Sequence, residues 1–221
     1  MRLFYFLSAL VFPPKCVLCS RILTESETDL CHSCRADTPD YSPENIKIPY
    51  LAQYRALWYY EGTVRSSLLR FKFRNARSYA QVYGRLIAMR IMQNGDSFDA
   101  LTWAPISRLR KWRRGYDQME LVAQATGKEL GIAPVRTLKK VRHNPPQSGL
   151  RDASARRANV LGVYQPYRPE QFVGKRVLLL DDVITTGATA SECARVLLTA
   201  GAQEVSCFAV AAASHKRKNS R

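Results

Sequence analysis

The clearest pattern of apolar and polar positions lies in the last third of the chain. Residues 176–180 read Arg-Val-Leu-Leu-Leu, an apolar run typical of a parallel strand that is buried on both faces. Helical spacing follows over 188–200, Gly201 ends that helix, and 205–212 is a second buried strand. Two buried strands joined by a helix predict a right-handed crossover unit.

The middle of the chain continues this alternation. The expected elements there are strands over 56–60, 99–104 and 135–141, helices over 64–71, 79–89 and 119–130, and a basic loop after residue 104. Residues 143–158 lack apolar periodicity and predict a long loop, which in a compact domain is usually functional or mobile. The whole pattern predicts an α/β fold with a doubly wound, mostly parallel sheet, whose ligands bind beyond the carboxyl ends of the strands.

Four cysteines near the N-terminus have the spacing of a metal site. Cys16 and Cys19 form one C-x2-C pair, Cys31 and Cys34 form another, and eleven residues separate the pairs. Four thiolates in this arrangement can hold one tetrahedral Zn²⁺, and an all-cysteine site is closed, so zinc would contribute to folding rather than catalysis. Two disulfides, or a redox-active pair, are the alternatives.

The N-terminal apolar run, Leu3 to Phe12, is about half as long as a membrane-spanning helix. A signal peptide is disfavoured by a single preceding Arg, by the lack of a small-x-small cleavage site and by Pro13-Pro14-Lys15. We therefore expect no transmembrane segment and a cytoplasmic protein. The expected divisions are a helix and zinc module over 1–38, a linker over 39–53, a main domain over 54–213 and a basic flexible tail over 214–221.

The charge of the chain points to an anionic partner. Lys and Arg number 34 against 18 Asp and Glu, which gives a net charge of +16. Residues 104–157 contain thirteen Lys or Arg and four Asp or Glu, so more than half of the excess lies there. Nucleotides, nucleic acids and phospholipid surfaces all suit such a surplus.

The segment after the strand at 176–180 carries the strongest chemical signal. Asp181 and Asp182 are adjacent carboxylates at a strand end, a costly arrangement unless hydroxyls, a metal or a cation offset their repulsion. Thr185, Thr186 and Thr189 then offer hydroxyls around Gly187, at the start of a helix whose dipole favours an anion. A sugar phosphate that spans both ends matches the whole segment.

This segment resembles the phosphoribosyl-pyrophosphate signature of type I phosphoribosyltransferases, and it is neither a Walker A loop nor a dinucleotide fingerprint. The resemblance implies a type I phosphoribosyltransferase fold. It also implies that Asp181 and Asp182, the catalytic pair, contact the ribose hydroxyls and that Mg²⁺ arrives on the pyrophosphate. The 5-phosphate would be held by Thr185, Thr186, Gly187, Ala188 and Thr189.

A second stretch, Trp103 to Gln118, resembles the block W-x-P-x4-R-x3-R-G-[FY]-[ND]-Q of the ComF family. These are competence-associated, phosphoribosyltransferase-like proteins, including DNA-utilisation proteins, with an N-terminal four-cysteine zinc element. The resemblance continues in 142–147 and 156–160 and spans nearly the whole chain. Arg108 and Arg114 are suited to fork-like phosphate contacts, with Gly115 at a tight turn, whereas Gln147 and Arg156 are candidates within the mobile loop.

Two functions remain open at this point. The resemblance implies a module for uptake or use of external DNA, acting at the inner face of the membrane with a helicase-like ATPase and recombination mediators on single-stranded DNA. The alternative is an active transferase that attaches the phosphoribosyl group to a nitrogenous acceptor. The basic charge suits both, and no base-recognising hood is visible, because the zinc module and the helices of 62–94 take its place.

Overall fold

The computed structural model describes residues 13–42, 46–142 and 158–214. At its centre is a four-stranded parallel sheet in the order β1-β6-β5-β2. The strands are β1 (Tyr54–Tyr59), β2 (Ala100–Trp103), β5 (Arg176–Ile184) and β6 (Glu204–Ala212). Each strand had been placed within a few residues from its apolar run.

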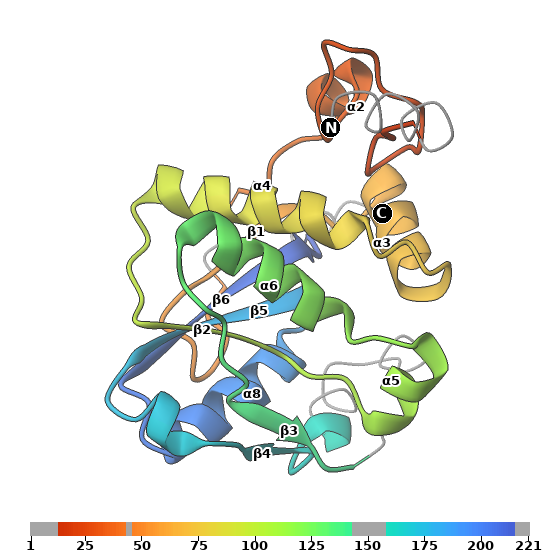
Figure 1. Cartoon of the computed structure of the whole chain (residues 1–221). Helices are drawn as coiled ribbons and strands as arrows, with labels where there is room; N and C mark the ends of the chain where they lie inside the picture. The colour runs from red at the N-terminus through yellow and green to blue at the C-terminus, as the bar shows by residue number, and fades with distance from the viewer. Residues whose placement is uncertain (1–12, 43–45, 143–157, 215–221) are drawn as a thin grey trace, which may run out of the picture.

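Helices cover both faces of this sheet, which confirms the doubly wound arrangement (Figure 1). One face carries α3 (Gly62–Phe73), α4 (Tyr79–Asn94) and α6 (Gln118–Leu130), and the other carries α8 (Ala188–Thr199). Side chains of β5 alternate between the two cores: Leu178 and Leu180 pack toward α3, α4 and α6, whereas Val177 and Leu179 pack toward α8. This alternation is the two-residue period of a strand that is buried on both sides.

Three expectations for the secondary structure were wrong in detail. The strand expected over 135–141 is only β3 (Leu138–Lys140), and it pairs antiparallel with β4 (Tyr164–Pro166) outside the main sheet. The basic loop contains a short helix, α5 (Arg108–Arg114), because Ser107 caps it by accepting the Arg110 N–H at 3.3 Å. Finally, β5 does not end at Leu180, because residues 181–184 continue to pair with β6.

The cysteine-containing segment packs on the outer side of α3 and α4 (Figure 1). It contains the short helix α2 (His32–Asp37), and a 3-10 turn, η2 (Pro169–Gln171), precedes β5. Ser67 and Arg70 of α3 donate to the main-chain oxygens of Val17 and Leu18. Since Val17 and Leu18 are fully buried, these bonds satisfy carbonyls that water cannot reach. No helix in the described part of the chain is both long and apolar enough to cross a bilayer.

Candidate functional site

A cleft of about 820 Å³ opens beyond the carboxyl end of β5, where the α/β rule places ligands. Its walls come from the end of β5, the segment around α5, one face of α3, and β3 and β4. The charged side chains among its lining residues are six cations and two carboxylates: Arg65, Lys72, Arg110, Arg113, Arg114, Lys140, Asp181 and Asp182. The cleft is therefore built for a ligand with more negative charge than the aspartates carry.

The two aspartates lie in the cleft wall in different environments. Asp181 is buried, and its carboxylate accepts the Asp182 N–H at 2.8 Å. Burial, and next the charge of Asp182, raise the pKa of Asp181 to about 7. Asp182 is more exposed and forms an ion pair with Lys72 Nζ of α3 at 2.8 Å. The Lys72 ammonium group thus offsets the repulsion between the two adjacent carboxylates.

The threonine loop lies at the start of α8. Thr185 and Thr189 line the cleft, whereas Thr186, Gly187 and Ala188 do not. The Thr186 hydroxyl is buried without a hydrogen-bond partner among the described residues. Gly187 adopts φ 74°, and a β-carbon there would come within 2.6 Å of the Ile48 side chain. Only glycine therefore lets this turn close against Ile48.

The basic helix α5 places three arginines in the cleft: Arg110, Arg113 and Arg114. Arg114 donates to Gln118 Oε1 at 3.0 Å and stacks over the Phe73 ring at 5.1 Å. Arg108 is not among the lining residues, although it was expected beside Arg114. The turn after α5 is set by Gly115, at φ 76°, and by the buried Asp117, which caps α6 by accepting the Met119 N–H at 3.1 Å.

Sequence reasoning missed several cleft residues. Lys140, at the end of β3, lies near the Tyr164 ring at 5.2 Å, and burial lowers the pKa of its ammonium group to about 8. Lys72 and Arg65 lie on α3, a helix for which the sequence indicated only apolar periodicity. They are seven residues apart, about two helical turns, and so share one face of the helix. Gln147 and Arg156 lie outside the described residues.

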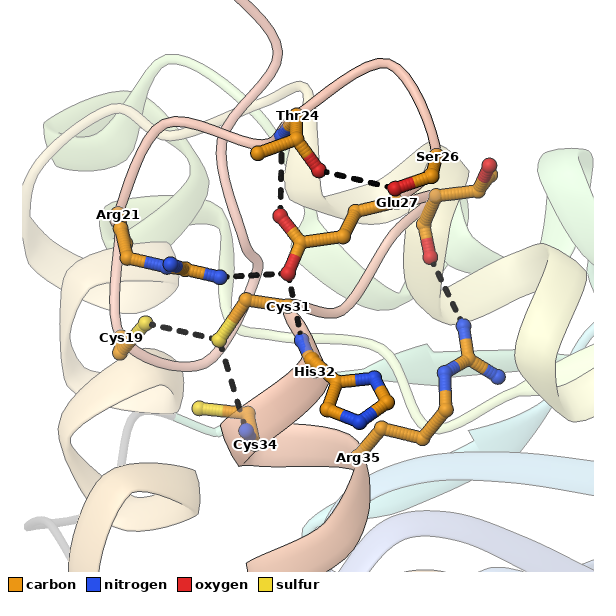
Figure 2. A network of polar contacts seen from close by, with 10 residues as sticks. Cys19, Arg21, Thr24, Ser26, Glu27, Cys31, His32, Cys34 and Arg35 are labelled. Atoms are coloured by element: carbon orange, nitrogen blue, oxygen red, sulfur yellow. Dashed lines mark hydrogen bonds and ion pairs between the residues drawn. The ribbon is translucent and has the colours of Figure 1, made fainter.

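The four N-terminal cysteines come together on the far side of α3 from the cleft. Their sulfurs all lie within 4.8 Å of one another, and a tetrahedral zinc site with bonds of about 2.3 Å requires S···S separations of about 3.8 Å. Figure 2 shows the Glu27 carboxylate accepting hydrogen bonds from the N–H groups of Thr24 and His32, at 2.9 and 2.7 Å. Glu27 so connects the loop between the two cysteine pairs to the second pair. The geometry fits one tetrahedral ion.

Comparison with known proteins agrees with this architecture. The Phosphoribosyl transferase domain model matches residues 120–221, and the Double zinc ribbon domain model matches residues 7–44. Competence protein F of Haemophilus influenzae is 26% identical over 90% of this chain and 97% of its own length. The chain belongs to the ComF/YhgH family. Its fold is the phosphoribosyltransferase-like α/β fold, with an N-terminal four-cysteine cluster, as expected from the sequence.

Other ComF/YhgH relatives are more distant or match over less of their length. Competence protein ComFC of Streptococcus pneumoniae is 24% identical over 83% of this chain and 77% of that protein. DNA utilization protein YhgH of Salmonella typhi is 31% identical, but the match covers 61% of this chain and 60% of the relative. A solved glutamine phosphoribosylpyrophosphate (PRPP) amidotransferase from B. subtilis aligns at 19% identity and a TM-score of 0.44, over 64% of this chain and 30% of the enzyme.

Proposed function

We propose that the cleft binds phosphoribosyl pyrophosphate with Mg²⁺ and that the protein acts in the uptake or use of external DNA. The observation that carries the ligand is that one cleft is lined by Asp181 and Asp182, by two residues of the threonine loop and by three arginines of α5. A ribose with a phosphate at one end and a pyrophosphate at the other offers hydroxyls and two anionic groups to these three kinds of side chain.

Each part of the ligand meets suitable chemistry. Thr185 and Thr189 would bind the 5-phosphate with the N-terminus of α8, and the partnerless Thr186 hydroxyl would support that loop. The aspartates would accept hydrogen bonds from the ribose hydroxyls. Arg110 and Arg114 would bind the pyrophosphate in the two-point contacts that guanidinium groups favour. Mg²⁺ would neutralise charge on the pyrophosphate, and the carboxylate oxygens of Asp181 and Asp182 are the donor type it prefers.

The biological role rests on the relatives named above, a competence protein and a DNA utilization protein. We propose a cytoplasmic protein that works with a helicase-like ATPase and recombination mediators. Transfer of the phosphoribosyl group to a nitrogenous acceptor is a second candidate function. It is favoured by the wall of the cleft formed by Tyr60, Leu69 and Phe73, which an aromatic base could cover.

Isothermal titration of the full chain with phosphoribosyl pyrophosphate and Mg²⁺ tests the ligand. Asp182→Asn should weaken binding at least tenfold, because the ribose hydroxyls lose a charged acceptor. Glu204→Gln, an exposed carboxylate change at the opposite end of the sheet, is the matched control and should bind as the native chain does. Absence of binding at millimolar ligand would refute the proposal.

We further propose that Cys16, Cys19, Cys31 and Cys34 hold one structural Zn²⁺. Elemental analysis should find roughly one zinc per chain, and Cys34→Ser should lower both zinc content and Tm. Ser33→Ala, at the adjacent exposed position, is the control and should keep both. A zinc-free native chain of unchanged Tm would contradict this site.

A further inference from the structure

The short helix α5 has two functionally different faces. Arg110, Arg113 and Arg114 recur at helical spacing and line the cleft. Arg108, Lys111 and Trp112 have the same spacing, are rotated about half a turn from the first set, and are absent from the cleft lining. No residue of α5 is buried, so packing does not explain the composition of this outer face.

Trp112 is the most unusual member of this face, because 81% of its side chain is exposed. That is the highest exposure of any large apolar side chain in the described part of the protein. A solvated indole contributes nothing to the core, whereas a Lys or Arg there would keep the helix equally soluble. An exposed aromatic ring among cations suits a ligand that offers both flat rings and negative charge.

A second exposed aromatic ring lies beside the last residue of α5, on the cleft side of the helix. Phe73 is 68% exposed and lies under the Arg114 guanidinium, 5.1 Å from ring centroid to Cζ. Phe73 lines the cleft, so the outer face of α5 itself combines one solvated ring, Trp112, with Arg108 and Lys111. Lys111 pairs with Glu120 at 2.7 Å, but both side chains are at least partly exposed, so the pair can exchange for a phosphate at little cost.

We propose that this outer face, made of Arg108, Lys111 and Trp112, binds single-stranded nucleic acid. Stacking of bases on aromatic rings beside phosphate-binding cations is the general mode of sequence-tolerant single-strand binding. Duplex DNA would hide its base faces from Trp112. A membrane surface is a poorer fit, because an interfacial helix needs a continuous apolar face, and five of the seven residues of α5 are cationic.

This inference deepens the proposed role in DNA use and supplies the point of direct contact. It does not require phosphoribosyl pyrophosphate, since the cleft and the outer face lie on opposite sides of α5. The arrangement would hold a strand beside the mouth of the cleft.

The test is fluorescence anisotropy of a labelled oligo-dT with the full native chain. Trp112→Ala should weaken binding roughly tenfold, since stacking on one ring is lost, and Trp112→Phe should recover most of it. Met92→Ala, which also removes an exposed apolar side chain but on α4, is the control and should bind normally. Equal affinity of Trp112→Ala and the native chain would overturn the proposal.

Salt dependence separates the two kinds of contact. Arg108→Gln should lower the slope of log affinity against log salt by about 0.7, the value for one phosphate of a single strand, whereas Trp112→Ala should leave the slope unchanged. Binding to phosphatidylglycerol vesicles that Trp112→Ala abolishes, without binding to oligo-dT, would instead assign the surface to a membrane and refute the inference. Asp182→Asn should keep its affinity for oligo-dT, so failure of the cleft proposal remains distinguishable.

Discussion

Lys72 of α3 and Asp182 of β5 form an ion pair of 2.8 Å, which joins α3 to the two adjacent aspartates that line the cleft. Both side chains are at least three-quarters shielded from solvent, so the attraction is weakly screened. The charge of Lys72 also lowers the pKa of neighbouring Asp181 and partly offsets the effect of burial. The pair therefore makes it possible for two adjacent carboxylates to face one cavity.

Lys72→Met should destabilise the protein by roughly 1–3 kcal/mol at pH 8, because Asp182 loses a charged partner. The loss should be smaller at pH 5, below the value of about 7 to which the pKa of Asp181 is raised, because a protonated Asp181 no longer repels Asp182. Denaturant unfolding at both pH values measures this. Lys128→Met, on the exposed surface of α6, should show no such pH dependence, and a pH-independent loss in Lys72→Met would contradict the coupling.

Asp181 itself should give the unliganded protein a falling stability between pH 4 and pH 7. Its pKa rises from 3.8 to about 7 on folding, so in this window the folded state binds a proton that the unfolded state has released. Stability from this group is complete below pH 4 and declines until the pH passes 7. Asp181→Asn should remove the decline, which unfolding curves across the window would show, and an unchanged profile would rule out Asp181 as its source.

Lys140 should make phosphoribosyl pyrophosphate binding sensitive to alkaline pH. Burial lowers its pKa to about 8, so above this value the free cleft loses a cation that an anionic ligand favours. Affinity should fall up to tenfold per pH unit above pH 8. In titration calorimetry, Lys140→Met should bind more weakly and without this step; a retained step would assign it to another group.

Gly187→Ala and Gly131→Ala form a matched pair. Both glycines have φ near +70°, but a β-carbon at Gly131 meets nothing within 4 Å, whereas at Gly187 it meets Ile48. Gly131→Ala should cost about 1 kcal/mol from backbone strain alone. Gly187→Ala should cost more and should also weaken ligand binding, because the threonine loop must shift. Equal costs and unchanged affinity would show that the Ile48 contact is unimportant.

The support of α3 by the cysteine module can be tested at Ser67. Ser67→Ala leaves the buried carbonyl of Val17 without its donor and should cost about 1–3 kcal/mol. Ser66→Ala, one residue away, removes only an exposed hydroxyl that donates to Gly62 O at 3.1 Å, and should change stability little. Thermal unfolding distinguishes them; indistinguishable Tm values would mean that the module does not depend on this contact.

Local patterns in the sequence determined much of this protein. Apolar runs located the strands of the parallel sheet, because a strand buried on both faces admits few polar residues. The acid pair, the threonine loop and the cysteine pairs were visible because each is a contiguous segment whose spacing reflects one turn or one metal site. The division at residues 38, 53 and 213 stays a prediction.

Only the tertiary structure decided which cationic side chains share the cleft with Asp181 and Asp182. Lys72 and Lys140 are distant in sequence from Asp182, and nothing local to either residue indicates that α3 and β3 end at the same cleft. Likewise, the basic stretch from Arg108 to Arg114 gives the total charge, but only its coiling into α5 divides it into a cleft face and a solvent face. Contacts of this kind depend on how elements pack, which is set by the whole core rather than by neighbouring residues.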